Sequence, residues 1–462
     1  MDGLRTACPR CHELESQVAA LERRVAELTA QVDKLIAALE EARRGGKRQA
    51  APLRKAEPKP SPQKAGRKSG DAHGPHAHRA AIPPEQIDER YEASLPDRCP
   101  HCGSRHVQET HTTKQSQTEI PRRPIHREFT IPIGQCQTCG SRVQGRHPLQ
   151  TSDALGAAAS QLGPDAHAAF VTLNKGLGLA HGKCCRFFRD VFDITIARAT
   201  SVRSLLRTAK RAEPAYDQIR LAMRHSSWVV PDETGWRVGG RNAWLHAFVT
   251  RNATCYEIGD RSGAIAERLL GRDWSGTMIH DGWSVYDRFE QAFHQQCVGH
   301  LQRRCRELPE TAARGAVRLP RQVLTLIDEA FWLRRQWRGH RLSGNALAGA
   351  GLELACRMED LASGHFVYEP NRLLAKHILK HAMDWFWFLI DPTIDAANYR
   401  AEQAIRPAVV NRKVWGGNRT WAGARAQSVL TSLLVTLAQR GHQALTWFST
   451  ARCSTVPPPL PP

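Results

Sequence analysis

A heptad pattern near the N-terminus is the feature that most narrows what this chain can fold into. From Leu14 to Leu39, valine and leucine recur in unbroken alternating steps of four and three residues. A β-branched residue at one core position with leucine at the other favours a parallel two-stranded coil. We therefore predict a leucine-zipper coiled coil over residues 13–41 and a homodimer formed through residues 14–39. An amphipathic helix packed on its own chain is the alternative.

The segment after the heptad, residues 42–96, has the composition of a disordered linker. Between residues 43 and 80, eleven Lys and Arg face only Glu57 and Asp71, and Pro and Gly recur. Such a composition buries too little apolar area to offset chain entropy. The linker is either a solvated spacer or a sliding contact to DNA phosphates.

The whole chain of 462 residues carries 65 Lys and Arg against 45 Asp and Glu, a formal net charge of +20. Such an excess indicates a polyanionic partner, most often nucleic acid. No stretch approaches the roughly 18 apolar residues of a membrane helix, and the N-terminus lacks an apolar signal core. We expect a cytoplasmic protein that binds nucleic acid and no membrane.

Two matching Cys-x-x-Cys-Gly turns mark residues 97–147 as a zinc-ribbon domain. They contain Cys99 with Cys102, and Cys136 with Cys139. Each turn supplies two thiolates, and Zn²⁺ takes four such ligands in a tetrahedron. We predict one structural Zn²⁺ on these four cysteines. A thioredoxin-like redox pair is the alternative, but its βαβ context is missing.

The segment between the two cysteine pairs shows alternation over Thr110–Ile120 and Arg127–Ile133, which predicts a β-hairpin between them. A third pair, Cys8 and Cys11, lies at the start of the heptad. Two chains could share a metal there, but an idle pair is the simpler interpretation.

Residues 151–225 are predicted to be helical. Ala157–Leu173 is alanine-rich with apolar helical spacing, and two short helical stretches, Cys185–Val191 and Ser201–Leu206, are separated by Asp193–Ala199. This arrangement is compatible with a DNA-binding helix-turn-helix. Two packed helices without contact to DNA are the alternative.

The pattern changes from residue 226 onward. Residues 226–308 predict three strands, a helix, a strand, a helix and a strand, the order of a ribonuclease-H-like sheet. The expected strands are Trp228–Pro231, Ala243–Thr250, Thr254–Ile258, Thr277–Ile279 and Gln296–Val298, and the expected helices are Ile265–Leu270 and Val285–Phe293.

Helical spacing dominates the rest of the chain. Residues 309–392 predict a helical insertion, and residues 393–440 the last part of the core, with a helix from Asp395 to Arg406 that Pro407 ends. Residues 441–462 are expected to be a tail. The fold class is therefore multidomain α+β.

Candidate catalytic acids follow from the same pattern. Asp232 and Asp281 each come just after a short apolar strand, and such strand ends converge on one crevice. Two neighbouring carboxylates repel, and Mg²⁺ relieves that repulsion through hard oxygen ligands. Glu402 would complete the site, with Asn398 and Arg406 one turn away on the same helix face. Four other acids are rival candidates: Glu233, Glu257, Asp260 and Glu290.

Three blocks in this region resemble the catalytic blocks of the IS66 family of bacterial transposases. They are VVPDETGWRV (Val229–Val238), TMIHDGWSVYDRF (Thr277–Phe289) and NYRAEQAIRPAVVNRK (Asn398–Lys413). The order of parts over residues 14–445 is similar too. Gln403 departs from the family, which commonly has Arg after the glutamate. Cys297-Val-Gly-His300 with Arg303-Arg304 is similar to a Cys-x-x-His-x-Arg-Arg stretch in these enzymes, whose role is open; a buried core Cys and His is one interpretation.

The resemblance implies a transposase with Asp232, Asp281 and Glu402 as its DDE triad. It implies Mg²⁺ or Mn²⁺ as catalytic cofactor, and cleavage at transposon ends followed by strand transfer into target DNA. It also implies double-stranded DNA as partner, small accessory transposition proteins, and a place on the bacterial nucleoid. A non-catalytic zinc-containing DNA-binding regulator and a structure-specific nuclease on the same fold are the alternatives.

Overall fold

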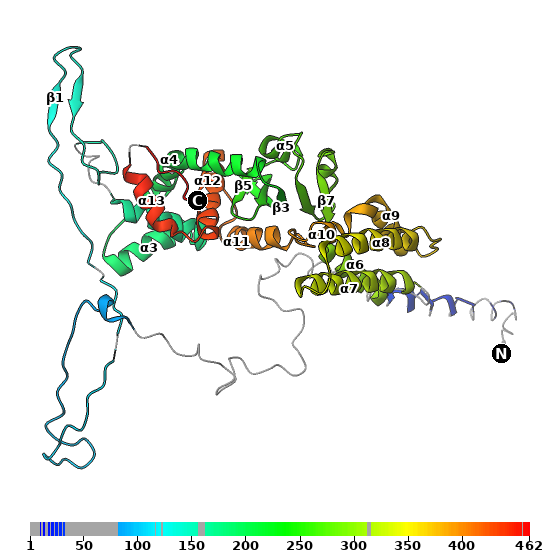
Figure 1. Cartoon of the computed structure of the whole chain (residues 1–462), viewed down its shortest axis with the longest axis horizontal. Coiled ribbons are helices and arrows are strands. Elements are labelled where there is room, and N and C mark those ends of the chain that lie inside the picture. The colour runs from blue at the N-terminus through cyan, green and yellow to red at the C-terminus, as the bar shows by residue number, and fades with distance from the viewer. Residues whose placement is uncertain are drawn as a thin grey trace, which may run out of the picture. The chain divides into compact units, whose positions relative to one another are not determined.

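The computed structural model describes residues 82–155 except 116 and 122, residues 162–311, 316–454 and 456–462, and scattered helical positions between 10 and 32. The chain divides into two compact units, Met1–Ile120 and Pro121–Pro462. The helical insertion and the whole sheet described below belong to the second unit (Figure 1). No helix among the described residues is long and apolar enough to cross a membrane.

In the first unit, the described positions of the heptad are helical. Their apolar members are all exposed: Val18, Leu21, Val25, Leu28 and Val32. The heptad residues Leu14, Leu35 and Leu39, the cysteines Cys8 and Cys11, and linker residues 43–80 lie outside the described residues. The coiled-coil dimer therefore stays a prediction.

The hairpin predicted between the cysteine pairs is wrong. No strand is present in the described residues from 105 to 132, all but a few of which are exposed. Instead, β1 (Ile133–Gln135) and β2 (Arg142–Gln144) form an antiparallel pair around the second cysteine pair (Figure 1). Alternating residues do not hold a strand when there is no apolar surface to pack one face against.

A five-stranded mixed sheet forms the centre of the second unit. It consists of β3 (Trp228–Val238), β4 (Arg241–Val249), β5 (Thr254–Gly259), β6 (Thr277–His280) and β7 (Phe293–Gln296). Their spatial order is β5-β4-β3-β6-β7, with antiparallel pairing from β5 to β3 and parallel pairing from β3 to β7. The predicted succession of strands is confirmed. The helix expected over Val285–Phe293 is only a short 3-10 helix, η6 (Ser284–Arg288).

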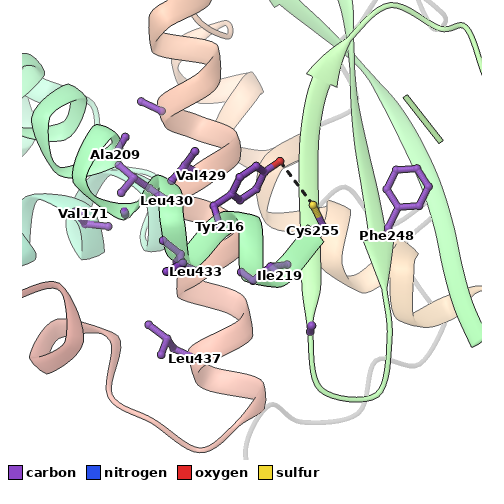
Figure 2. Packing of buried hydrophobic residues seen from close by; sticks show 14 of the residues in the cluster. Val171, Ala209, Tyr216, Ile219, Phe248, Cys255, Val429, Leu430, Leu433 and Leu437 are labelled. Atoms are coloured by element: carbon purple, nitrogen blue, oxygen red, sulfur yellow. Dashed lines mark hydrogen bonds between the residues drawn. The ribbon is translucent and has the colours of Figure 1, made fainter. Parts of the chain in front are cut away.

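One face of the sheet packs against α4 (Arg198–Arg224) and α5 (Ala264–Leu270). Figure 2 shows Tyr216 of α4 next to Cys255 of β5, with Ile219 below it and Val429 and Leu430 of α12 opposite. The Tyr216 hydroxyl also donates to the Tyr256 carbonyl oxygen at 2.8 Å. This contact fixes the long helix to the edge strand.

The open edge of β5 is closed by α12 (Trp421–Gln439). The backbone N–H groups of Thr254 and Tyr256 donate to the hydroxyls of Thr436 (3.0 Å) and Ser432 (2.8 Å) on this helix. An unpaired strand edge can pair with another chain and cause aggregation. These hydroxyls accept the hydrogen bonds that the N–H groups at the edge would otherwise leave unmade. The polar residues in the otherwise apolar helix α12 thus have a structural use.

The other face of the sheet packs against α11 (Tyr399–Trp415) and, further along, against α6 (Val298–Thr311). The predicted insertion, residues 309–392, is helical as expected. It consists of the end of α6, α7 (Arg318–Arg338), α8 (Gly344–Ala362), α9 (Glu369–Lys380), the 3-10 helix η7 (Ala382–Asp384) and α10 (Trp387–Ile390). These helices share one apolar cluster with β3 and β6.

Pro407 does not end its helix, as the sequence predicted; α11 continues through it to Trp415. The missing N–H leaves the carbonyl oxygen of Gln403 without its helical partner. Both residues are exposed, so water can bond to that oxygen. The helix instead ends at Gly416, whose φ of 81° is left-handed.

Region 151–225 and the C-terminus differ from expectation in extent. The described helices are α2 (Pro164–Val171), the π-helix η5 (Thr172–Gly176), α3 (His181–Phe192) and the 27-residue α4, much longer than the stretch predicted. Residues 441–462, expected as a tail, contain α13 (Ala444–Cys453), which packs into the core through Trp447 and Phe448.

Candidate active site

Asp232 lies in β3, and Asp281 directly follows β6, the neighbouring parallel strand. Trp228 pairs with Thr277, and Val229 with Met278. Each aspartate is four residues beyond its strand's member of the first pair. Asp281 follows β6 directly, as predicted, whereas Asp232 lies inside β3, which continues to Val238. β3 is longer than its apolar run because β4 pairs with it from Val230 to Val238.

The two aspartates also point to the same face of the sheet. Side chains on one face of a strand repeat every second residue. Val230 and Ile279, each two residues before an aspartate, are buried in the same apolar cluster as α6 and the insertion. The face that carries both carboxylates is therefore the face that α11 and α6 cover.

The turn after Asp281 needs a glycine. Gly282 has a φ of 89°, and a Cβ there would lie 3.0 Å from Gln296 Oε1 and 3.3 Å from His377 Cε1. The Asp281 carboxylate accepts the N–H of Trp283 at 3.1 Å, which holds its side chain back over the turn. Asp-Gly at this position thus sets the direction of the carboxylate.

Glu402 reaches the site from the first turn of α11. The helix begins at Asn398, which is 1% exposed and whose N–H donates to the sulfur of Cys297 at 3.5 Å. Glu402 Oε1 lies 3.6 Å from Nε2 of His300 on α6, and the glutamate side chain is 43% exposed. The third acid therefore lies at an accessible helix start that packs on α6.

The pKa of Asp232 links the three acids, because the charges of the other two act on it. Burial is the largest cause that raises the pKa of Asp232 to about 7. The negative charges of Glu233, Asp281 and Glu402 raise it further, and the Glu233 N–H bonded to its carboxylate (2.8 Å) lowers it. Asp232 thus feels the charge of both other predicted members of the triad. A raised carboxylate pKa caused by burial and like charges marks functional sites.

The rival acids have other partners. Glu233, the next residue along β3, faces the opposite side of the sheet and lies 3.3 Å from Arg261. Glu257 accepts the Tyr216 hydroxyl at 2.6 Å, and Asp260 accepts that of Ser262 at 2.6 Å. Glu290 is exposed beyond η6. Glu257, Asp260 and Glu290 thus have other settings, whereas Glu233 stays a rival, because the charge of Asp281 also raises its pKa after burial does.

The two predicted supporting residues differ in setting. Asn398 is buried at the start of α11, and its Oδ1 has no hydrogen-bond partner in the described structure. Arg406 is exposed one turn beyond Glu402. Asn398 can thus orient the helix start, while Arg406 is free to reach an anion in solvent.

The two cysteine pairs have the same turn, each within its own unit. The Cys99 N–H donates to the Ser104 carbonyl oxygen (2.8 Å) and that of Gly103 to Cys99 (2.9 Å); the second turn repeats both bonds at 2.9 Å. Gly103 and Gly140 have φ values of 75° and 71°.

Hydrogen bonds within these turns favour the thiolate form of Cys99 and Cys139. The N–H groups of His101 and Cys102 lower the pKa of Cys99. The Ser141 hydroxyl and N–H lower the pKa of Cys139 to about 7. The thiolate is the form that ligates metal. Each turn has the shape and chemistry of half a zinc site.

A divalent cation fits the carboxylate set by its chemistry. Asp232, Asp281 and Glu402 offer hard oxygen ligands, and a cation would offset the burial and the like charges that raise the pKa of Asp232. Within the described ranges, no three His, Cys, Asp or Glu side chains stand close enough to enclose a metal ion. The three acids thus share one face and one electrostatic field without forming a closed cage.

A comparison with known proteins identifies the family to which the chain belongs. A family model described as "Transposase IS66 family" matches residues 159–426, which is more than half of the chain and spans all three acids. No curated protein matches the chain. The match includes the sheet, the insertion and the start of α12. The chain belongs to the IS66 family of transposases.

Proposed function

We propose that this protein cleaves DNA at transposon ends and joins the freed ends to target DNA, with Asp232, Asp281 and Glu402 as its DDE triad. The observation that supports the proposal is the raised pKa of Asp232, which burial causes first and to which the charges of Asp281 and Glu402 contribute. Family membership supports the same reaction class.

Bound between the three carboxylates, Mg²⁺ or Mn²⁺ would supply the charge that activates water and stabilises the phosphoryl transition state. In the first step a water oxygen bonds to phosphorus and the bond to the 3′ oxygen breaks, which frees a 3′ hydroxyl. In the second step that hydroxyl attacks a target phosphate, and a target 3′ oxygen leaves. The carboxylates would hold the cation in position, and exposed Arg406 is available to bind a phosphate oxygen.

The sheet supports a ribonuclease-H-like core. Three antiparallel strands are followed by two parallel ones on the far side of the first strand, and the last acid enters on a helix after the insertion. In this proposal the acids of the site come from β3, the end of β6 and α11. The arrangement also explains how residues 309–392 can be inserted without disturbing the sheet.

We propose that the four thiolates of Cys99, Cys102, Cys136 and Cys139 bind one structural Zn²⁺. The support is that two separate segments form the same turn with lowered thiol pKa values. A small ribbon with exposed strands has little other core, so a metal would supply its stability.

DNA contacts are proposed at α4 and at the linker. Arg203, Arg207 and Lys210 are exposed at helical spacing along the first half of α4, after a five-residue connection from α3. This is the layout of a helix-turn-helix with a basic outer face. The eleven basic residues between 43 and 80 would add contacts to phosphates that do not depend on sequence.

The exposed heptad residues support dimerisation through residues 14–39, which would pair two transposon ends in one complex. Small accessory proteins and a place on the bacterial nucleoid in the cytoplasm belong to the same proposal.

Strand transfer is the test that separates this function from its alternatives. The full chain would be incubated with Mg²⁺, a labelled duplex carrying the terminal sequences of its own element, and a plasmid target. We expect labelled ends joined to the plasmid through their 3′ hydroxyls. Cleavage without joining would favour a structure-specific nuclease, and binding without cleavage would favour a DNA-binding regulator.

A further inference from the structure

The segment Cys297–His300 connects the two sides of the candidate site. It begins where β7 ends and forms the start of α6. The Cys297 N–H donates to the carbonyl oxygen of His280, the residue before Asp281, at 2.7 Å. The Val298 N–H donates to the carbonyl oxygen of Ala396, just before α11, at 2.9 Å. One short stretch therefore bonds to the backbone next to Asp281 and to the backbone just before the helix of Glu402.

Two side chains of this segment continue the connection. Cys297, 4% exposed, accepts the N–H of Asn398 through its sulfur and so fixes the start of the Glu402 helix. His300, one turn further on, places Nε2 3.6 Å from Glu402 Oε1. That is within ion-pair reach and slightly beyond a hydrogen bond.

His300 is not a histidine whose polar groups are satisfied in the core. Its Nδ1 is buried without a hydrogen-bond partner, although buried polar atoms are nearly always bonded. In the described structure the one polar contact of its ring is with Glu402. An imidazole whose Nδ1 is buried and whose Nε2 faces a carboxylate is suited to orient that carboxylate.

We propose that His300 is a positioning residue, which holds the Glu402 carboxylate in the orientation that a divalent cation requires. The inference rests on the proposed function for its meaning, since it assigns Glu402 to the metal site. Cys297 sets the place of the helix, and His300 sets the direction of the side chain. Glu402 is exposed and would otherwise sample several rotamers.

The test compares two replacements of similar size in the full chain. His300→Gln keeps a polar N–H group near the position of Nε2, and His300→Leu fills the space without one. His365→Leu, at an exposed histidine between α8 and α9, is the control. Mn²⁺ alone is the probe, and calorimetry measures its binding at the site that Asp281→Asn abolishes.

We expect His300→Leu to weaken Mn²⁺ binding about 10- to 100-fold, His300→Gln by only a few-fold, and His365→Leu not at all. A purely structural His300 predicts equal effects for Leu and Gln, so equal affinities for these two variants would overturn the inference. Cleavage of end DNA is measured in parallel. If the wild type and the variants bind Mn²⁺ with these relative affinities but the wild type does not cleave end DNA, the proposed function is wrong. The positioning role of His300 then still stands.

Discussion

Asp232, inside β3, and Asp281, directly after the parallel strand β6, are each four residues beyond the pair formed by Trp228 and Thr277. Neighbouring strands are about 4.8 Å apart, so two carboxylates at such positions on one face repel strongly unless one is protonated or a cation lies between them. Burial is the main cause of the raised pKa of Asp232, and the negative charges of Glu233, Asp281 and Glu402 add to it. The two carboxylates therefore lower the stability of the folded protein, but they also provide a site that can bind a cation.

Asp232→Asn should therefore stabilise the protein in the presence of a chelator. The pKa of Asp232 in the folded protein is about 7, against an ordinary value of 3.8. The contribution of this carboxyl group to the free energy of unfolding is therefore complete below pH 3.8 and is lost as the pH rises through 7. At pH 8 we expect the variant to be more stable than wild type by about 1–3 kcal/mol, and the difference to vanish near pH 4. Thermal melts at both pH values measure this.

The same melts with Mn²⁺ give the converse result. A cation that binds the carboxylates stabilises the wild type by mass action, so its melting temperature should rise with Mn²⁺ and that of Asp232→Asn should not. An equal Mn²⁺ response of the two proteins would argue against a cation at Asp232.

Zinc should be present at one ion per chain after reducing purification. Cys102→Ser removes a ligand from the first turn and should lose the ion, because three thiolates hold Zn²⁺ far less firmly than four. Cys356→Ser, at an exposed cysteine on α8, is the matched control and should keep it. Metal analysis of the three proteins decides; zinc retained by Cys102→Ser would place the metal elsewhere.

The basic face of α4 should contribute to the salt dependence of DNA binding. Replacing Arg203, Arg207 and Lys210 by Ala should flatten the log–log salt dependence by about 0.9 for each DNA phosphate that the variant no longer neutralises. Arg321 and Arg335, exposed on α7, are replaced in a control protein. Salt titrations of binding provide the slopes; an unchanged slope in the α4 variant would remove this helix from the DNA interface.

The heptad should dimerise the full chain. Leu21→Glu with Leu28→Glu places charge at two core positions of the coil and should give a monomer in sedimentation. Ala20→Glu, on the outer side of the same heptad, should remain a dimer. A monomeric wild type, or a dimeric double variant, would show that residues 14–39 do not pair two chains.

Local patterns predicted much of the sheet and the elements that carry Asp281 and Glu402. The short apolar run before Asp281 is a real strand, and Glu402 is on a helix face as its spacing indicated. The sequence puts Asp232 after its strand, whereas in the structure it lies inside β3. Pairing with β4 extends β3 through polar residues, and pairing between strands is not visible in a single segment. Pro407 was misjudged because an exposed helix side tolerates the missing hydrogen bond. The interaction of His300 with Glu402 joins residues on either side of the whole helical insertion, so no local pattern shows it.

The central claim is that Asp232, Asp281 and Glu402 act as one catalytic set. Its most direct test is cleavage of a labelled transposon-end duplex in Mg²⁺ by Asp232→Asn, Asp281→Asn and Glu402→Gln, with DNA affinity measured alongside. Glu290→Gln, at an exposed rival acid, is the control. We predict that each of the three variants loses more than about 100-fold in cleavage while binding DNA within a few-fold of wild type, and that the control cleaves normally. Normal cleavage by any one of the three would contradict the account.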